Sequence, residues 1–227
     1  MADMRSTLTG QPAWLPSTAY RADYSGAMSL PPQPVRVEVV CTANICRSPF
    51  VALLLGHHLD EVSPGEFDIR SSGTLALAGT PADGGSRRVA RDRGLSLRDS
   101  RAVQTTPAAL AESDLILVMD KNHRQTVIDE YPGAIRRTFL LKEFARLLGD
   151  LDAQQPWEAR LGSLRDRSAW TRWRFLVRSC AAVRGQWRAE DDELDDPFTH
   201  GLRAFEAMAR EVDTAVATIV DVERRTR

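Results

Sequence analysis

The stretch VRVEVVCTANICRSPFVALL (residues 35–54) contains the strongest structural signal in this sequence. Its first part is apolar and rich in β-branched residues, which predicts a buried strand, and Pro49 behind Ser48 suits the first turn of a helix. Between them, Cys41 and Arg47 bracket five residues whose backbone N–H groups can turn inward. Because the helix adds its positive N-terminal end to the same small volume, the stretch predicts a loop that binds an anion.

Strand-like and helix-like patterns alternate after this stretch. Further strands are predicted over residues 67–71, 115–119 and 137–141, and helices over residues 48–59, 81–93, 107–113, 121–130, 144–148 and 202–222. Alternation at this spacing implies right-handed strand–helix–strand units, so the predicted fold class is α/β with a doubly wound parallel sheet. Ligands of such sheets bind beyond the carboxyl ends of the strands, which is where the Cys41 loop lies.

Two parts of the chain fall outside this alternation. Residues 1–33 contain scattered Pro, Ser, Thr and Gly without a helical or strand period, and we expect a disordered tail before a domain over residues 34–227. Residues 149–193 are rich in Trp and Arg, and we expect a helical insertion there, with Trp173 and Val177 on one apolar stripe. The insertion either packs on the core through its tryptophans, which is the simpler interpretation, or contacts substrate or a partner.

The composition excludes several classes of protein. With a net charge of -1, the chain has no global attraction to nucleic acid or to an anionic membrane. No apolar run approaches the roughly 18 residues of a membrane span. Its three cysteines do not form the paired framework of a small secreted protein, and its four histidines show no metal-ligand spacing with them. We expect a cytoplasmic monomer or weak dimer with no nucleic-acid or membrane partner and no metal.

Cys41 has the surroundings of a reactive thiolate. A helix N-terminus, the guanidinium of Arg47 and the hydroxyl of Ser48 all stabilise a negative sulfur, and the thiolate is the nucleophilic form of cysteine. Arg47 also presents a planar fork suited to two phosphate oxygens, and a cation at the positive end of a helix needs an anion to offset it. The alternative, a small buried cysteine at a strand end, explains neither Arg47 nor the length of the loop.

Transfer of a phosphoryl group to sulfur needs a proton donor for the leaving oxygen, and Asp196 is the candidate. A carboxylic acid on a separate loop can protonate the leaving group and then act as a base toward water. Asp196 is followed by Pro197 and precedes the last predicted helix. The alternative interpretation is an Asp that caps this helix, and the local pattern does not separate the two.

Four motifs resemble the low-molecular-weight protein tyrosine phosphatases. They are Cys-Thr-Ala-Asn-Ile-Cys-Arg-Ser-Pro (41–49), Ser-Gly-Thr (72–74), a strand that ends Val-Met-Asp (118–120) and Asp-Pro (196–197). The resemblance covers about residues 34–148 and 194–223, and it implies the three-layer, phosphotyrosine phosphatase I-like fold with a four-stranded parallel sheet. It further implies a metal-independent hydrolase without a cofactor, with Cys41 as nucleophile, Arg47 as phosphate binder and Asp196 as general acid.

The resemblance also implies roles around these residues. The phosphate-binding loop would include Thr42, Ala43, Asn44, Ile45, Cys46 and Ser48, supported by Ser72 and Asp120, with Phe198 as a wall of the substrate site. Cys46 would form a reversible disulfide with Cys41, or else pack beneath the loop. The family pattern has Gly at Ala43, a second aromatic residue at Thr199 and often His at Asp99, so the surroundings of the loop differ in this chain.

We expect the protein to hydrolyse phosphomonoesters through a phosphocysteine intermediate, with protein phosphotyrosine or a small aryl phosphate as substrate. Two other functions use a similar loop: a thiol-dependent arsenate reductase, and a catalytically weak module that binds phosphorylated partners. The reductase needs a resolving cysteine, and Cys180, the only cysteine outside the loop, lies on an apolar stripe. The binding module is disfavoured because Cys41, Arg47 and Asp196 are all present.

Overall fold

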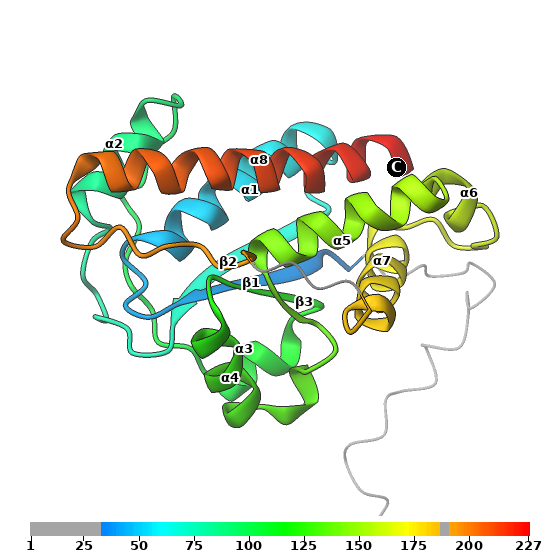
Figure 1. The fold of residues 1–227 in the computed structure, drawn as a ribbon, viewed down its shortest axis with the longest axis horizontal. Helices are drawn as coiled ribbons and strands as arrows, with labels where there is room; N and C mark the ends of the chain where they lie inside the picture. Colours follow the sequence, from blue (N-terminus) through cyan, green and yellow to red (C-terminus); the bar gives the residue numbers. More distant parts are fainter. Residues whose placement is uncertain (1–32, 187–190) are drawn as a thin grey trace, which may run out of the picture. The chain divides into compact units, whose positions relative to one another are not determined.

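The computed structural model describes residues 33–186 and 191–227, and its centre is a four-stranded parallel sheet. The strands are β1 (Val35–Cys41), β2 (Phe67–Gly73), β3 (Leu115–Val118) and β4 (Thr138–Leu140), in the order β2-β1-β3-β4 (Figure 1). Val40 of β1 pairs with Ser72 on one side and Val118 on the other, so the strands end at one edge of the sheet. The predicted α/β class with a parallel sheet is confirmed.

Helices cover both faces of this sheet. They are α1 (Arg47–Val62), α2 (Gly84–Arg91), α3 (Pro107–Glu112), α4 (Lys121–Glu130), the 3-10 turn η2 (Pro132–Ala134), α5 (Leu141–Gln154), α6 (Trp157–Leu161), α7 (Ala169–Val183) and α8 (Leu202–Thr226). In Figure 1, α1, α5 and α8 lie above the sheet, and α3 and α4 lie below it. Within residues 33–186 and 191–227, no helix has both the length and the apolar character that a membrane span requires. Apart from residue 33, the tail predicted over residues 1–33 lies outside the described residues, as does Trp187.

The two faces of the sheet are both apolar. Val37 and Val39 of β1 belong to the core cluster that includes α1, α5 and α8. Val40 packs instead with Ile116 and Val127 in a second cluster, on the side of α3 and α4. Strands buried on both faces lack polar alternation, which is why the apolar runs in the sequence predicted a parallel sheet with helices on each side.

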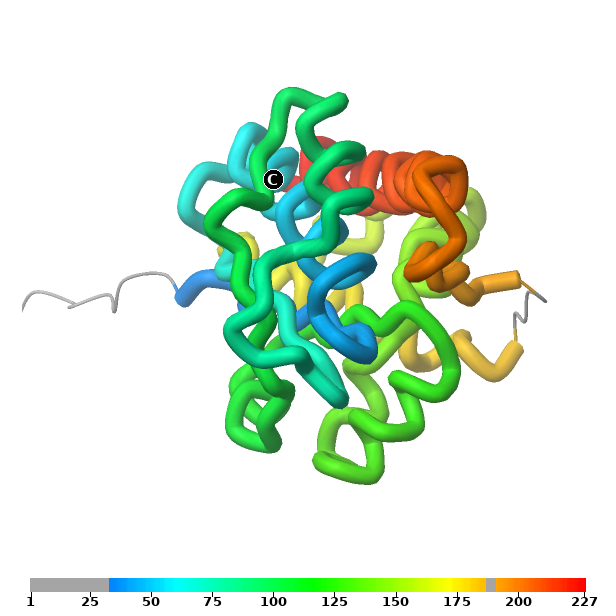
Figure 2. Tube along the Cα trace, turned by 90° about the vertical axis from the view of Figure 1, so that its left-hand side faces the viewer, coloured from blue at the N-terminus to red at the C-terminus, as the bar shows by residue number. Residues whose placement is uncertain are grey.

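Three segments meet at the carboxyl edge of the sheet. β1 ends at Cys41 and continues through the loop into α1, while β3 is followed by Asp120, which caps α4 by accepting the His123 N–H. The segment before α8 joins them, because the Leu194 N–H donates to the carbonyl of Met119. Figure 2 looks onto this edge, with the loop near its centre and the segment before α8 beside it in orange.

The Trp-rich segment forms α6 and α7, which pack onto the core. Trp157 and Trp173 are among the largest fully buried side chains, and Cys180 on the predicted stripe is buried as well. Arg172 is also buried, although the pattern did not indicate it. Its guanidinium lies 2.5 Å from the carboxylate of Glu223, which ties α7 to α8.

Candidate active site

The loop between β1 and α1 turns its backbone carbonyls outward. The carbonyls of residues 41, 42, 43 and 45 accept hydrogen bonds from backbone N–H groups of other segments, and that of Cys46 accepts the Ser86 hydroxyl at 2.8 Å. None of the N–H groups of residues 42–46 donates to another described residue. Because the N–H and C=O groups of a peptide point in opposite directions, these N–H groups face the inside of the loop and form a concave site for an anion.

Asn44 holds the loop in this shape. Its φ of 57° is a left-handed conformation that Asn tolerates better than most residues. Its buried side chain donates to the hydroxyls of Ser48 (2.8 Å) and Ser71 (3.0 Å), and its Oδ1 accepts the Val103 N–H at 2.8 Å. Ala43 has no positive φ, so the side chain at this position causes no backbone strain.

Ser72 and Gly73 bring the end of β2 against the loop. The Ser72 carbonyl accepts the Ser48 hydroxyl at 3.3 Å, whereas the Ser72 hydroxyl pairs with Thr105 at 2.8 Å. A Cβ on Gly73 would lie 2.4 Å from a carbonyl oxygen of the loop, so only glycine permits this approach. The hydroxyl that reaches Asn44 from β2 belongs to Ser71, which the sequence analysis did not single out.

The two cysteines of the loop have different surroundings. Cys41 is buried, and its Sγ lies 2.9 Å from the hydroxyl oxygen of Ser48, a distance at which the hydroxyl can donate to a thiolate. Burial, together with the nearby charges of Asp83 and Asp196, raises the pKa of Cys46 to about 12. Cys46 is therefore a protonated thiol at neutral pH, and both cysteines are free thiols.

The buried guanidinium of Arg47 joins the loop to two other segments. Its Nη1 lies 3.3 Å from both Oδ2 of Asp120 and the carbonyl of Leu194, and its Nη2 lies 2.6 Å from Oδ2 of Asp196. Its Nε is buried and donates to no described residue. A buried donor without an acceptor is costly, so this N–H favours an oxyanion as its partner.

Asp120 and His123 connect Arg47 with the start of the loop. Nε2 of the buried His123 lies 2.8 Å from Oγ1 of Thr42, and its Nδ1 lies 2.9 Å from Oδ2 of Asp120, off the direction of a good hydrogen bond. Burial opposes ionisation of Asp120, but the close His123 ring, the hydrogen bond from the His123 backbone N–H and the charge of Arg47 outweigh it and lower the pKa of Asp120 to about 2. The sequence analysis indicated Asp120 but missed this role of His123.

Asp196 reaches Arg47 across 149 positions of sequence. Its second oxygen, Oδ1, accepts the Phe198 N–H at 3.1 Å, which is a local turn contact. The N-cap of α8 is Gly201, so the interpretation of Asp196 as the cap of the last helix is wrong. The carboxylate is 46% exposed and lies next to the guanidinium, where it can move between Arg47 and a bound ligand.

Exposed apolar side chains flank the site. Leu75 and Leu77 are 73% and 50% exposed, and their N–H groups donate to carbonyls of the loop. Phe198 and Leu202 are 48% and 45% exposed and follow Asp196 in the chain. Phe198, predicted as a substrate wall, thus lies two residues from the carboxylate, and these side chains offer apolar surface to a group attached to a bound anion.

Within residues 33–186 and 191–227, one cluster has side chains close enough to share a metal ion, and it lies away from the loop. It consists of His57, His58 and Glu61 on α1, whose ligand atoms all lie within 4.8 Å of one another. Their side chains are 42–59% exposed. None of the predicted site residues belongs to this cluster.

Comparisons with known proteins place these features in a family. Residues 36–169 match the family described as Low molecular weight phosphotyrosine protein phosphatase. The chain is 35% identical over 123 residues to the probable low molecular weight protein-tyrosine-phosphatase EpsP of Ralstonia nicotianae, covering 54% of this chain and 79% of that protein. It is 31% identical over 111 residues to a protein-arginine-phosphatase of Geobacillus stearothermophilus, covering 49% and 72%. The tyrosine phosphatase AmsI of Erwinia amylovora has a similar crystal structure, with a TM-score of 0.57 and 28% identity over 83% of this chain and 93% of that one.

The fold and the loop define an α/β protein whose Cys-x5-Arg loop is built to receive an oxyanion. Because the family match spans more than half of the sequence, the chain belongs to the low molecular weight phosphotyrosine protein phosphatase family. The resemblance seen in the sequence motifs is thereby confirmed. The match ends at residue 169, where α7 begins.

Proposed function

We propose that the protein hydrolyses phosphomonoesters, above all phosphotyrosine in proteins, through a phosphocysteine intermediate on Cys41. The observation that carries this proposal is that a distant carboxylate, that of Asp196, meets the loop that contains Cys41, Arg47 and Ser48. Ser48 contacts the sulfur of Cys41 at one end of the loop, and Asp196 contacts Arg47 at the other end. Family membership and relatives named protein-tyrosine-phosphatases support the same activity.

In the first step, the sulfur of Cys41 attacks phosphorus, and the bond between phosphorus and the leaving oxygen breaks. The inward N–H groups of the loop and the Arg47 guanidinium hold the non-bridging oxygens as negative charge spreads over them. Protonated Asp196 gives its proton to the leaving oxygen, which departs as a neutral alcohol or phenol. Asp196 is then a carboxylate, and the phosphoryl group is bonded to sulfur.

In the second step, water attacks the phosphocysteine. Asp196 takes a proton from this water, the sulfur–phosphorus bond breaks, and Cys41 departs as a thiolate. Inorganic phosphate leaves, so the residues return to their starting charges. The ion pair between Asp196 and Arg47 fits this cycle, because a bound phosphate dianion competes for the guanidinium, and the released carboxylate takes a proton from solvent before it faces the leaving oxygen.

Two observations bear on the substrate. The exposed side chains of Leu75, Leu77 and Phe198 suit a flat aryl group attached to the phosphate, which favours phosphotyrosine. The relative from Geobacillus stearothermophilus is named a protein-arginine-phosphatase, which makes phosphoarginine the second candidate substrate.

The arsenate reductase alternative requires a resolving thiol, and the remaining cysteine is poorly suited to this task. Cys180 is fully buried in α7, and burial raises its pKa far above the usual range of a thiol. A binding module without turnover would not need a carboxyl group beside the anion site. The reaction products distinguish the three functions: a phosphatase releases phosphate, a reductase reduces arsenate, and a binding module does neither.

The test measures phosphate release from p-nitrophenyl phosphate in the presence of a metal chelator. We expect hydrolysis by the native chain and none by Cys41→Ala, while a parallel assay of arsenate reduction with a thiol donor stays at background. Peptides that carry phosphotyrosine or phosphoarginine then rank the two substrates, with the higher kcat/KM expected for phosphotyrosine. Hydrolysis retained by Cys41→Ala would overturn the proposal.

A further inference from the structure

A large cavity lies between α7 and the segment that contains α3 and η2. It has a volume of about 940 Å³, and its charged lining consists of Arg136, Arg137, Arg174, Arg178, Glu112 and Asp114. Asp114 comes just before β3, and its N–H donates to the Arg36 carbonyl near the start of β1. The cavity therefore lies at the amino edge of the sheet, roughly 15–20 Å from Cys41, which ends the same strand.

Two of the four arginines are held in place by aromatic side chains. The guanidinium of Arg174 lies 4.3 Å from the ring centre of Trp170, and that of Arg137 lies 5.5 Å from the ring centre of Tyr131. Arg137 also donates to the carbonyl of Leu110 at 3.2 Å. Side chains fixed in this way lose less conformational entropy when a ligand binds.

The carboxylates of the cavity are engaged by other groups. Asp114 accepts the Trp170 indole N–H and the Arg36 backbone N–H, both at 3.1 Å. Glu112 pairs with the Arg36 side chain at 3.7 Å. Among residues 33–186 and 191–227, no carboxylate oxygen lies within 4.0 Å of a guanidinium nitrogen of any of the four arginines.

Four arginines and two carboxylates give the cavity a net positive charge, which favours an anionic ligand. Arg174 and Arg178 are four positions apart on α7, and like charges at this spacing destabilise a helix. The planar forks of arginine match phosphate oxygens, and the volume is in the range that holds a drug-sized molecule and far exceeds one phosphate group. Val177 and Ala181 add apolar surface to the lining. We propose that this cavity binds a ligand that carries two or more phosphate groups.

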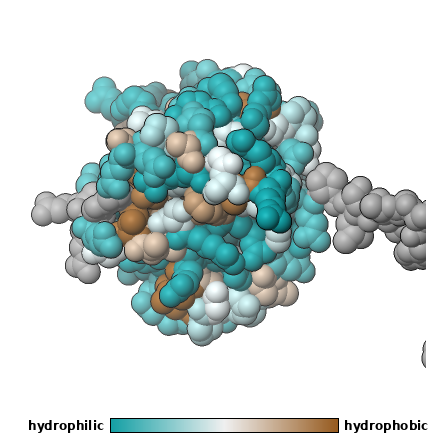
Figure 3. All heavy atoms as spheres, turned by 90° about the vertical axis from the view of Figure 1, so that its right-hand side faces the viewer, coloured by the Kyte–Doolittle hydropathy of each residue, from teal (hydrophilic) through white to brown (hydrophobic). Residues whose placement is uncertain are grey.

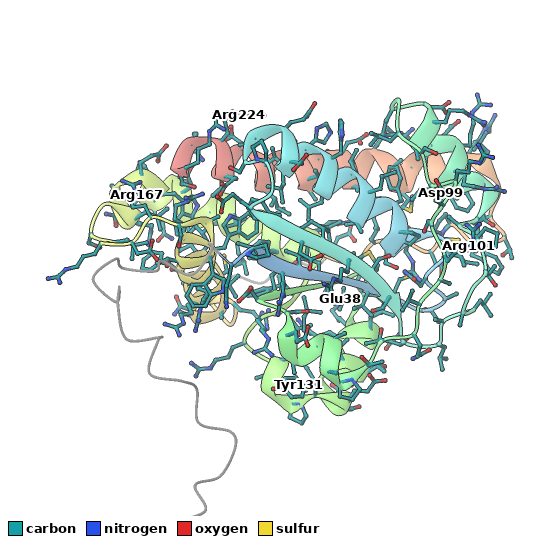
Figure 4. All side chains as sticks on the ribbon, turned by 180° about the vertical axis from the view of Figure 1, so that it is seen from behind. Glu38, Asp99, Arg101, Tyr131, Arg167 and Arg224 are labelled. Atoms are coloured by element: carbon teal, nitrogen blue, oxygen red, sulfur yellow. The ribbon has the colours of Figure 1, made fainter. Side chains whose placement is uncertain are left out.

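The site is separate from the catalytic loop, and its α7 side lies in the part of the chain beyond the family match, whereas its other side is formed by residues 111–137 within the match. Figure 4 shows the two ends of the domain from behind, with Arg167 at the α6–α7 end and Asp99 at the α2 end. Figure 3 looks onto the α6–α7 end, whose coloured surface is mostly hydrophilic, as a site for a charged ligand requires. Arg174 and Arg178 lie on α7, which begins where the match to the family ends.

Isothermal titration calorimetry with methylene diphosphonate, which a phosphatase does not hydrolyse, tests the proposal on the full chain. We expect two sites in the native protein, one in the catalytic loop and one in the cavity. The double variant Arg174→Gln/Arg178→Gln should lose the cavity site, with an affinity at least about 100-fold lower, and keep the loop site. Arg47→Gln should do the reverse, which separates failure of this proposal from failure of the proposed catalytic function.

The matched control is Arg165→Gln/Arg167→Gln, which removes the same charge from two exposed arginines of the same segment outside the cavity. It should keep both sites. Both double variants, Arg174→Gln/Arg178→Gln and Arg165→Gln/Arg167→Gln, should hydrolyse p-nitrophenyl phosphate at the native rate. A single site in the native protein, or equal weakening by the control variant, would overturn the proposal.

Two sources of the phosphate groups are distinguished by a second titration. A peptide with two phosphotyrosines is titrated into Cys41→Ala, with and without Arg174→Gln/Arg178→Gln. Binding at the cavity site at least tenfold tighter than that of the diphosphonate, and lost in the combined variant while binding at the loop remains, assigns the cavity to a phosphorylated protein segment. Equal or weaker binding of the peptide assigns it to a free small molecule with several phosphate groups.

Discussion

Asp196 is the residue on which the proton balance of the proposed reaction depends. Asp196→Asn keeps the shape of the side chain and can still accept the Phe198 N–H, but it has no proton to give. We expect kcat for phenyl phosphate, which has a poor leaving group, to fall about 10²–10⁴-fold, and kcat for dinitrophenyl phosphate to fall much less. Steady-state kinetics with both substrates check this, and equal losses would contradict the role of Asp196 as the acid.

The charge of Asp120 contributes to stability in a way that depends on pH. Its pKa is lowered from 3.8 to about 2 in the folded protein, so its carboxylate adds about 2 kcal/mol of stability above pH 4, and this contribution is lost as the pH falls toward 2. Asp120→Asn keeps a side chain that can cap α4 but removes the charge. Urea unfolding should therefore show a loss of about 2 kcal/mol at pH 7 that shrinks toward pH 2, whereas a loss independent of pH would refute this account.

Several site residues that the sequence indicated contact residues close to them in the chain, whereas one residue that it missed contacts a residue far away in the chain. Cys41, Arg47 and Ser48 belong to one local motif, so their proximity follows from the turn between a strand and a helix. His123 reaches Thr42 across 81 positions, and its place on α4 resembles that of any histidine on a helix until the sheet order is known. Such pairings depend on which strands are neighbours, which no local pattern specifies.

The predicted ends of helices agree with the structure where a strong local signal marks them and differ where the signal is weak. α4 covers residues 121–130 as predicted, because Asp120 caps its start and Pro132 follows its end. α5 was predicted over residues 144–148 but covers Leu141–Gln154, since Glu143 bonds the N–H of Leu140 at the start and the apolar stripe continues to Leu151. A glutamate at the start of a helix and a continuing apolar stripe are present in the sequence, but they mark the ends of a helix less clearly than a proline or a glycine does.

Helix α7 is attached to α8 by one buried polar cluster, which gives a prediction at this scale. The fully buried carboxylate of Glu223 accepts Arg172, the Trp173 indole N–H at 2.8 Å and the Ser63 hydroxyl at 2.7 Å. Glu223→Ala leaves the Arg172 guanidinium buried without its partner, so we expect a loss of about 3–5 kcal/mol in urea unfolding.

The control for this prediction removes both charges. Arg172→Met/Glu223→Leu replaces the ion pair with apolar side chains of similar length, and it should recover part of the stability lost in Glu223→Ala. If Glu223→Ala alone cost less than about 1 kcal/mol, the ion pair would not be what holds α7 on α8.

Over the whole domain, arginines lie at two opposite edges of one sheet, and only those of the cavity at the amino edge lack carboxylate partners within the described residues. At the carboxyl edge, Arg47 is balanced by Asp120 and Asp196, which the proposed reaction uses in turn. At the amino edge, Arg174 and Arg178 of α7 have no such balance within the described residues. The matched part of the chain thus supplies the Cys41 loop, and α7 together with residues 111–137 lines the proposed second site for phosphate groups.

The central claim is that the phosphoryl group passes through Cys41, and a trapping measurement tests it most directly. The native chain is mixed with p-nitrophenyl phosphate, quenched in acid during the first turnovers, digested and analysed by mass spectrometry. We predict a phosphorylated peptide with the modification on Cys41, and none in Cys41→Ala. Turnover without any phosphorylated cysteine, or a phosphoryl group on another residue of the native chain, would contradict the account.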